Sequence, residues 1–152
     1  MNESTFTTRV MKDLNAHKGT HFVKIHGNRF SMGIPDLLGS ISSSVGFVYG
    51  GMFAVESKVI DIPKRETTMM NFTKDLTPVQ RSQMIKFHEA GAKVYLMVLC
   101  RPLNTIVYLD YTEWAGEYKM TQRQFHGMPK VGGHPHPYFP TQYNPTRKAR
   151  QR

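Results

Sequence analysis

The chain has 152 residues, with 20 Lys and Arg against 11 Asp and Glu, which gives a formal charge of +9 at neutral pH. Its length favours one domain with a single core, and its content of 39% hydrophobic and 20% charged residues argues against wholesale disorder and against a fibrous protein. No apolar run approaches the length of a membrane span. The excess of positive charge favours a polyanionic partner.

The first helical pattern and three strand patterns lie in the first 60 residues. Apolar residues at helical spacing predict a helix over residues 4–17, with Ser4 or Thr5 as its N-cap. The two glycines Gly50 and Gly51 favour a tight hairpin that leads into the third strand. Alternation of apolar and polar residues, interrupted by turn residues, predicts three strands over residues 21–26, 35–41 and 52–60.

The second half begins with a segment that shows no helix or strand pattern, residues 61–75, and we expect a solvated loop there. A helix is predicted from Thr77 to Gly91, because Thr77 is a good N-cap, Pro78 suits the first helical position and Gln80 completes a capping box. Beyond it, the pattern predicts strands over residues 93–100 and 105–109 and a helix over residues 112–124.

Compartment and domain layout follow from the two ends of the chain and from a single cysteine. The first residues lack the basic and apolar segments of a secretory signal, and Cys100 cannot form an internal disulfide. We therefore expect a cytoplasmic protein of a bacterial, archaeal or phage-infected host cell, with Cys100 packed in the core. Residues 126–152 contain five basic residues and no acidic one, and they are rich in Pro, Gly and His. We predict a folded domain over residues 1–125 and an extended basic arm over residues 126–152.

The residues with catalytic potential are Asp36, at the entrance of the second strand, and Glu56 and Lys58 in the third. Glu56 and Lys58 are two positions apart, so a strand places both side chains on one face. Carboxylate oxygens are the ligands that Mg²⁺ selects, and one or two carboxylates together with substrate phosphate are a usual Mg²⁺ set. A solvated strand face shows the same alternation of charges, so the triplet by itself leaves both interpretations open.

The order of these blocks, with Pro-Asp before one strand and Glu-x-Lys in the next, resembles the PD-(D/E)XK nuclease superfamily. It is similar in particular to VRR-NUC-type domains and to archaeal-type and phage Holliday junction resolvases. The resemblance covers residues 3–100 and implies an α/β fold, with a mixed central sheet flanked by helices in the order αβββαβ. The blocks that carry it are Lys24-Ile25-His26-Gly27, Gly33-Ile34-Pro35-Asp36-Leu37-Leu38-Gly39, Phe53-Ala54-Val55-Glu56-Ser57-Lys58, and Leu76-Thr77-Pro78-Val79-Gln80 running to Gly91. The core is then expected to include Val10, Leu14, Val23, Leu37, Val55, Val94, Leu96, Val98 and Ile106.

The resemblance also implies a site for Mg²⁺, or for Mn²⁺ in its place. The implied catalytic residues are Asp36, Glu56, Lys58, Glu3 and Gln80. The implied metal ligands are Asp36, Glu56, the backbone carbonyl of Ser57, and Glu3. Lys58 would lie beside the attacking water and the scissile phosphate. Asp13, near the far end of the first helix, is the less well placed alternative to Glu3.

The expected activity is Mg²⁺-dependent, structure-specific hydrolysis of phosphodiester bonds in DNA by a homodimeric Holliday junction resolvase. Two alternatives stay open: a VRR-NUC-like phage nuclease that acts on flaps, nicks or ends, and a non-catalytic protein that binds branched or duplex DNA. Candidate DNA-binding residues are Lys24, His26, Arg29, Ser31, Lys64, Arg65, Lys130, Arg147, Lys148 and Arg150.

Other chemistries lack their motifs. The sequence has no G-x-x-x-x-G-K-[ST] loop for nucleotide hydrolysis and no G-x-S-x-G nucleophile elbow. The histidine pairs His17 with His21 and His134 with His136 have no accompanying CxxC or second ligand cluster, so a structural zinc site is not expected.

Overall fold

The computed structural model describes residues 1–25, 32–42 and 51–128 of the chain. Its elements are α1 (Glu3–Asn15), β1 (Thr20–Lys24), β2 (Leu37–Ile41), β3 (Gly51–Asp61), β4 (Met69–Asn71), α2 (Pro78–Glu89), β5 (Lys93–Arg101), β6 (Thr105–Leu109), α3 (Tyr111–Trp114), β7 (Lys119–Thr121) and α4 (Gln122–Gly127). The predicted αβββαβ order of the α/β fold is confirmed, with the short β4 inserted before α2. No helix among the described residues is long and apolar enough to cross a membrane.

The central sheet has five strands in the order β1-β2-β3-β5-β6, and β4 pairs with β7 in a separate two-stranded sheet. Strands β1, β2 and β3 are antiparallel neighbours, β3 and β5 are parallel, and β6 is antiparallel to β5. The pairing of β2 with β3 ends at Leu37 opposite Val55, whereas β3 continues to Asp61. The second half of β3 therefore has β5 on one side and extends beyond β2 on the other.

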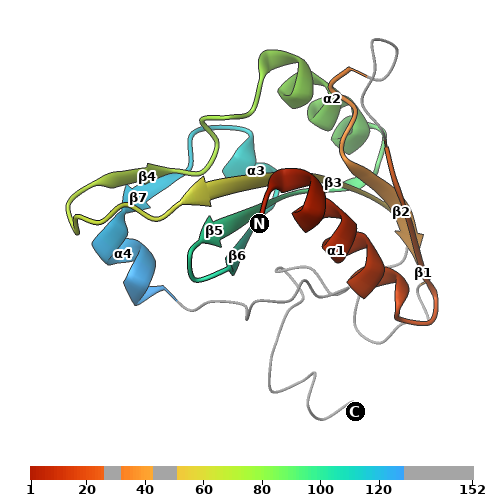
Figure 1. The fold of residues 1–152 in the computed structure, drawn as a ribbon. Coiled ribbons are helices and arrows are strands. Elements are labelled where there is room, and N and C mark those ends of the chain that lie inside the picture. Colours follow the sequence, from red (N-terminus) through yellow and green to blue (C-terminus); the bar gives the residue numbers. More distant parts are fainter. Residues whose placement is uncertain (26–31, 43–50, 129–152) are drawn as a thin grey trace.

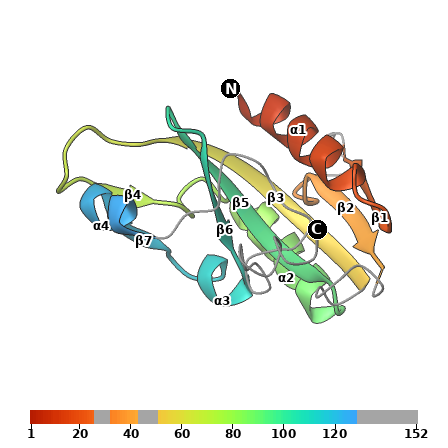
Figure 2. The same cartoon turned by 90° about the horizontal axis from the view of Figure 1, so that it is seen from below.

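Helices cover both faces of this mixed sheet, as Figure 1 and Figure 2 show for α1 and α2. The side chains of β3 divide between the two resulting cores, because successive residues of a strand point to opposite faces. The core beneath α1 includes Phe6, Val10, Leu14, Phe22, Leu37, Phe53, Val55, Met97 and Leu99. The core on the α2 side includes Ala54, Ile60, Met84, Val94, Leu96, Val98, Cys100, Trp114 and Phe125.

Eight of the nine predicted core residues are buried, and the exception is Val23, which is 45% exposed. The prediction for Val23 is wrong because β1 directs Phe22, 1% exposed, into the core beneath α1. Its neighbour Val23 then points to the opposite face. Cys100 is fully buried, as predicted.

Two further predictions differ from the structure in the identity or extent of an element. Helix α1 has Asn2 as its N-cap, with the Asn2 side chain accepting from the Thr5 amide, so the prediction of Ser4 or Thr5 is wrong. The helix predicted over 112–124 is instead α3, β7 and α4. The long-range pairing of β4 with β7 decides this region, and it also gives a strand to the segment expected to be a loop. Tertiary pairing of this kind overrides local propensity.

Two predictions concern residues at the margins of the described ranges. Helix α4 continues to Gly127, two residues beyond the predicted end of the folded domain at 125, and Phe125 is part of the core. Residues 129–152, most of the predicted arm, lie outside the described residues, as do residues 47–50 of the predicted hairpin.

Candidate functional site

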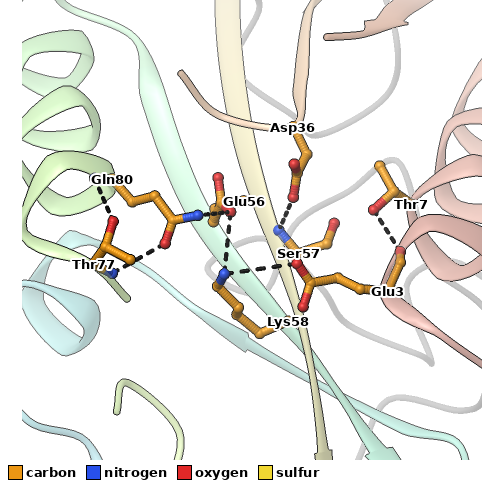
Figure 3. A network of polar contacts seen from close by, with 8 residues as sticks. All are labelled: Glu3, Thr7, Asp36, Glu56, Ser57, Lys58, Thr77 and Gln80. Atoms are coloured by element: carbon orange, nitrogen blue, oxygen red, sulfur yellow. Dashed lines mark hydrogen bonds and ion pairs between the residues drawn. The ribbon is translucent and has the colours of Figure 1, made fainter. Parts of the chain in front are cut away.

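The predicted catalytic residues come from three elements and from the residue that precedes β2, and they meet at the middle of β3. Asp36 directly precedes β2, Glu56 and Lys58 lie on β3, Gln80 is in the first turn of α2 and Glu3 is the first residue of α1. Figure 3 shows their side chains converging on β3 from α2 on one side and from α1 on the other.

Asp36 is fixed at the point where β2 stops pairing with β3. Its backbone carbonyl accepts from the Ile25 amide at 2.8 Å, and its carboxylate oxygen Oδ2 accepts from the Ser57 amide at 3.0 Å. The Asp36 side chain thus supplies the acceptor for a backbone N–H that lies beyond the end of β2. Since the N–H and C=O of one strand residue face the same neighbour, the Ser57 carbonyl also lies on this edge of β3.

Glu56 is a buried acid with one satisfied and one unsatisfied oxygen. Its side chain is on the α2 face of β3, the residue is 1% exposed, and Oε1 accepts from Gln80 Nε2 at 3.1 Å. Oε2 is buried without a hydrogen-bond partner in the described part of the chain. Burial, and next the negative charge of Asp36, raise the pKa of Glu56 to about 9. Without a cation, Glu56 therefore carries a proton at neutral pH.

Lys58 brings a buried ammonium group to the same place. The residue is 7% exposed, and Nζ lies 3.7 Å from Glu56 Oε1 and 3.7 Å from Glu3 Oε1. Because both Glu56 and Lys58 are buried, the alternative interpretation as a solvated strand face is wrong for this strand. The two side chains share one face of β3, as their spacing predicted.

Glu3 reaches Lys58 from α1, which lies over the other face of the sheet. Its side chain is 47% exposed, and its backbone carbonyl accepts from Thr7 Oγ1 at 2.8 Å. Burial raises the pKa of Glu3, with Lys58 acting in the opposite direction. Asp13 is ten residues further along α1, roughly 15 Å away at the helical rise, so Glu3 is the acid of this helix that contacts Lys58.

Gln80 is oriented by the N-terminal capping box of α2. Its Oε1 accepts from the Thr77 amide at 3.1 Å, and its own amide donates to Thr77 Oγ1 at 3.1 Å. Because Gln80 Oε1 accepts this bond from Thr77, Gln80 Nε2 is free to donate to Glu56 Oε1. The capping signals Thr77, Pro78 and Gln80 thus place a hydrogen-bond donor on the buried acid.

The donors near Asp36 and Glu56 have the chemistry of a divalent-cation site. Among residues 1–25, 32–42 and 51–128, no group of three or more His, Cys, Asp and Glu side chains is gathered closely enough to hold a metal ion. Two carboxylates and a backbone carbonyl remain, and one or two carboxylates are a usual protein contribution to Mg²⁺. Glu56 Oε2 is buried and has no hydrogen-bond partner among the described residues, and the pKa of Glu56 is raised first by burial and next by the charge of Asp36. Both observations indicate a place that a cation would stabilise. The residues present therefore fit a divalent metal.

The predicted DNA-binding residues that the structure describes do not gather at one place as the predicted catalytic residues do. Lys24 Nζ donates to the backbone oxygen and Oγ of Ser4 and to Thr8 Oγ1, so it ties β1 to α1. Lys64 and Arg65 are exposed between β3 and β4. The other predicted contacts lie outside the described residues: His26, Arg29, Ser31, Lys130, Arg147, Lys148 and Arg150.

Asp75 is a site neighbour that sequence reasoning did not identify. Its charge contributes to raising the pKa of Glu3, which places it near the Glu3 end of the site. Asp75 stands two residues before the N-cap Thr77. Its position just before the helix that supplies Gln80 could have identified Asp75 from the sequence.

No protein-family model matches the chain, and no curated protein matches it either. Among solved structures, the chain is similar to Hjc of Archaeoglobus fulgidus, a Holliday junction resolvase from an archaeal hyperthermophile. The two share 13% sequence identity with a TM-score of 0.49, over 86% of this chain and 90% of Hjc. A likeness at this level does not decide what the chain does.

Proposed function

We propose that the chain is a metal-dependent nuclease that hydrolyses phosphodiester bonds in DNA. The observation that carries the proposal is the buried Glu56 carboxyl, whose Oε2 has no hydrogen-bond partner among the described residues and which lies beside Asp36 and the Lys58 ammonium. Two acids placed together in a buried site oppose ionisation unless a cation compensates their charge. The formal charge of +9 supports a polyanionic substrate.

Asp36, Glu56 and the Ser57 carbonyl are the groups that would hold the divalent cation. When bound, such a cation lowers the pKa of a coordinated water and neutralises charge that develops on the phosphate. Glu56 has to give up its proton on binding, since metal ligands act in the deprotonated form. Gln80 donates to Glu56 Oε1 and so leaves Oε2 as the oxygen for the cation.

Lys58 supplies a fixed positive charge on the same face of β3. In a site shielded from water, a preorganised cation stabilises the negative charge that builds on the phosphate oxygens. Its Nζ lies 3.7 Å from Glu3 Oε1 and from Glu56 Oε1, and the ion pair with Glu3 holds the ammonium in place before substrate arrives. We assign Glu3 the role of positioning Lys58. The motif resemblance also implies that Glu3 is a metal ligand, and we propose this as a second role.

Within this class we propose a Holliday junction resolvase that acts as a homodimer, on the basis of the motif blocks around Asp36, Glu56 and Gln80. Two symmetric nicks in a four-way junction need two active sites, which a twofold-symmetric dimer provides. Electrostatic contacts with phosphates would supply most of the affinity, so binding should weaken steeply with salt.

The test compares cleavage of a four-way junction, a flap, a nicked duplex and a linear duplex, with and without Mg²⁺. Wild type is compared with Asp36→Asn, and Asp61→Asn is the matched control because Asp61 pairs with Arg101 in an exposed ion pair at the far end of β3. Symmetric Mg²⁺-dependent nicks in the junction that are lost only in Asp36→Asn support resolution. Cleavage of flaps, nicks or ends in place of the junction would support the proposed nuclease activity and contradict the proposed junction substrate. Equal cleavage by Asp36→Asn would refute the site.

A further inference from the structure

Gly33 lies in direct contact with the first turn of α2. Its φ is +78°, and a Cβ built at this position would lie 2.4 Å from Val79 Cγ1, 2.9 Å from the Val79 carbonyl oxygen and 3.0 Å from its carbonyl carbon. Two of these three atoms belong to the backbone, which a rotamer change cannot move. A side chain at position 33 would thus push the Gly33 segment and α2 apart.

The contact joins the two segments that supply the site. Gly33 is three residues before Asp36 on the chain, and Val79 directly precedes Gln80, which donates to Glu56 at 3.1 Å. A displacement at Gly33 would therefore change the position of Asp36 relative to the acid that Gln80 holds. Metal ligands need placement within about 0.5 Å, so a contact of this tightness matters for the site.

We propose that Gly33 is a positioning residue, whose close packing on Val79 sets Asp36 against Glu56 for a single divalent cation. The inference rests on the proposed function, because the cation is the one that the nuclease would use. It assigns to Gly33 a role beyond permitting a turn, since the missing side chain is what lets α2 approach.

Gly91 provides a matched control for the backbone conformation. It also has a positive φ, +98°, but a Cβ at this position would meet nothing within 4 Å, and it follows the C-terminal end of α2. Asn tolerates the left-handed region better than other side chains. Gly33→Asn and Gly91→Asn therefore both place Asn in the left-handed region. Only Gly33→Asn also brings a side chain into collision with Val79.

The experiment uses the full chain and measures Mn²⁺ affinity by isothermal titration calorimetry, together with the Mg²⁺ concentration that gives half-maximal cleavage of a four-way junction. Gly33→Asn should weaken Mn²⁺ binding by about tenfold or more and raise the half-maximal Mg²⁺ concentration in parallel. Gly91→Asn should stay within about twofold of wild type even where its unfolding midpoint falls. Wild-type Mn²⁺ affinity in Gly33→Asn would overturn the inference.

Val79→Ala keeps the inference testable if Gly33→Asn does not fold. Val79 is 43% exposed, so its truncation spares the core, yet it removes the side-chain atom that lies against Gly33. We expect Mn²⁺ binding about threefold weaker or more, and an unchanged affinity would overturn the inference. A wild type that binds no Mn²⁺ would instead overturn the proposed function, whereas a wild type that binds and cleaves, with both variants unchanged, overturns the role of Gly33 alone.

Discussion

Replacing Glu56 with Gln should remove a pH dependence from the stability of the metal-free protein. The pKa of Glu56 is raised from 4.5 to about 9 by burial and by the charge of Asp36. Between these two values the folded protein holds a proton on Glu56 that the unfolded chain has released. Stability therefore falls as pH rises through this window. Burial also raises the pKa of Asp36 and of Glu3, which acts in the same direction.

The size of this pH dependence follows from the shift in the pKa of Glu56. While Glu56 is protonated in the folded state and ionised in the unfolded one, the free energy of unfolding falls by about 1.4 kcal/mol per pH unit. Between pH 5.5 and 8.5 the total is up to about 4 kcal/mol, a large part of the stability of a domain of this size. Glu56→Gln has no proton to lose and should remove most of this slope. Its neutral amide can still accept from Gln80.

The assay is urea unfolding at several pH values in the presence of EDTA, with Glu66→Gln as the control at an exposed carboxylate. Wild type and Glu66→Gln should show the same falling slope, and Glu56→Gln a much flatter one. Adding Mg²⁺ should restore wild-type stability at high pH, since a ligand of the folded state stabilises it. Parallel slopes for wild type and Glu56→Gln would refute the assignment of a buried, protonated acid.

Three further substitutions test the parts around this acid. Gln80→Ala and Gln124→Ala each remove the N3 side chain of a capping box. Titration calorimetry should show Mn²⁺ affinity about tenfold weaker in Gln80→Ala and unchanged in Gln124→Ala. Equal affinities would exclude a role for Gln80 beyond the cap. Lys58→Met should slow single-turnover cleavage at saturating Mg²⁺ by about a hundredfold with Mn²⁺ binding retained, and a wild-type rate would contradict its role. Glu3→Gln should slow cleavage by about tenfold while changing the unfolding free energy by less than about 1 kcal/mol, whereas Asp13→Asn should cleave normally; the reverse outcome would make Asp13 the functional acid.

The parts of the site that sequence patterns predicted depend on short-range rules. The period of a strand placed Glu56 and Lys58 on one face, and the N-cap signals at Thr77 and Pro78 set the start of α2 and hence the position of Gln80. Asp36 could be placed because Pro is acceptable only as the first residue of such a strand, which puts Asp36 at the strand entrance.

The parts that could not be predicted depend on contacts between distant residues. The pairing of Met69–Asn71 with Lys119–Thr121 involves three residues on each side, too few for a pattern. It places one short strand inside the predicted loop and another between two short helices in the predicted helix. Predicting that Glu56 is buried and that Glu3 forms an ion pair with Lys58 requires the position of α1 relative to the half of β3 that extends beyond β2. No local periodicity carries that information.

The most direct test of the proposed site is Mn²⁺ binding measured by titration calorimetry at pH 7 in buffers of different ionisation enthalpy. Because Glu56 is protonated in the metal-free protein, binding at Asp36 and Glu56 should release about one proton per cation. Asp36→Asn and Glu56→Gln should each abolish the binding, and Asp61→Asn should retain it. Binding that releases no proton, or that persists in both site variants, would contradict a cation held by Asp36 and Glu56.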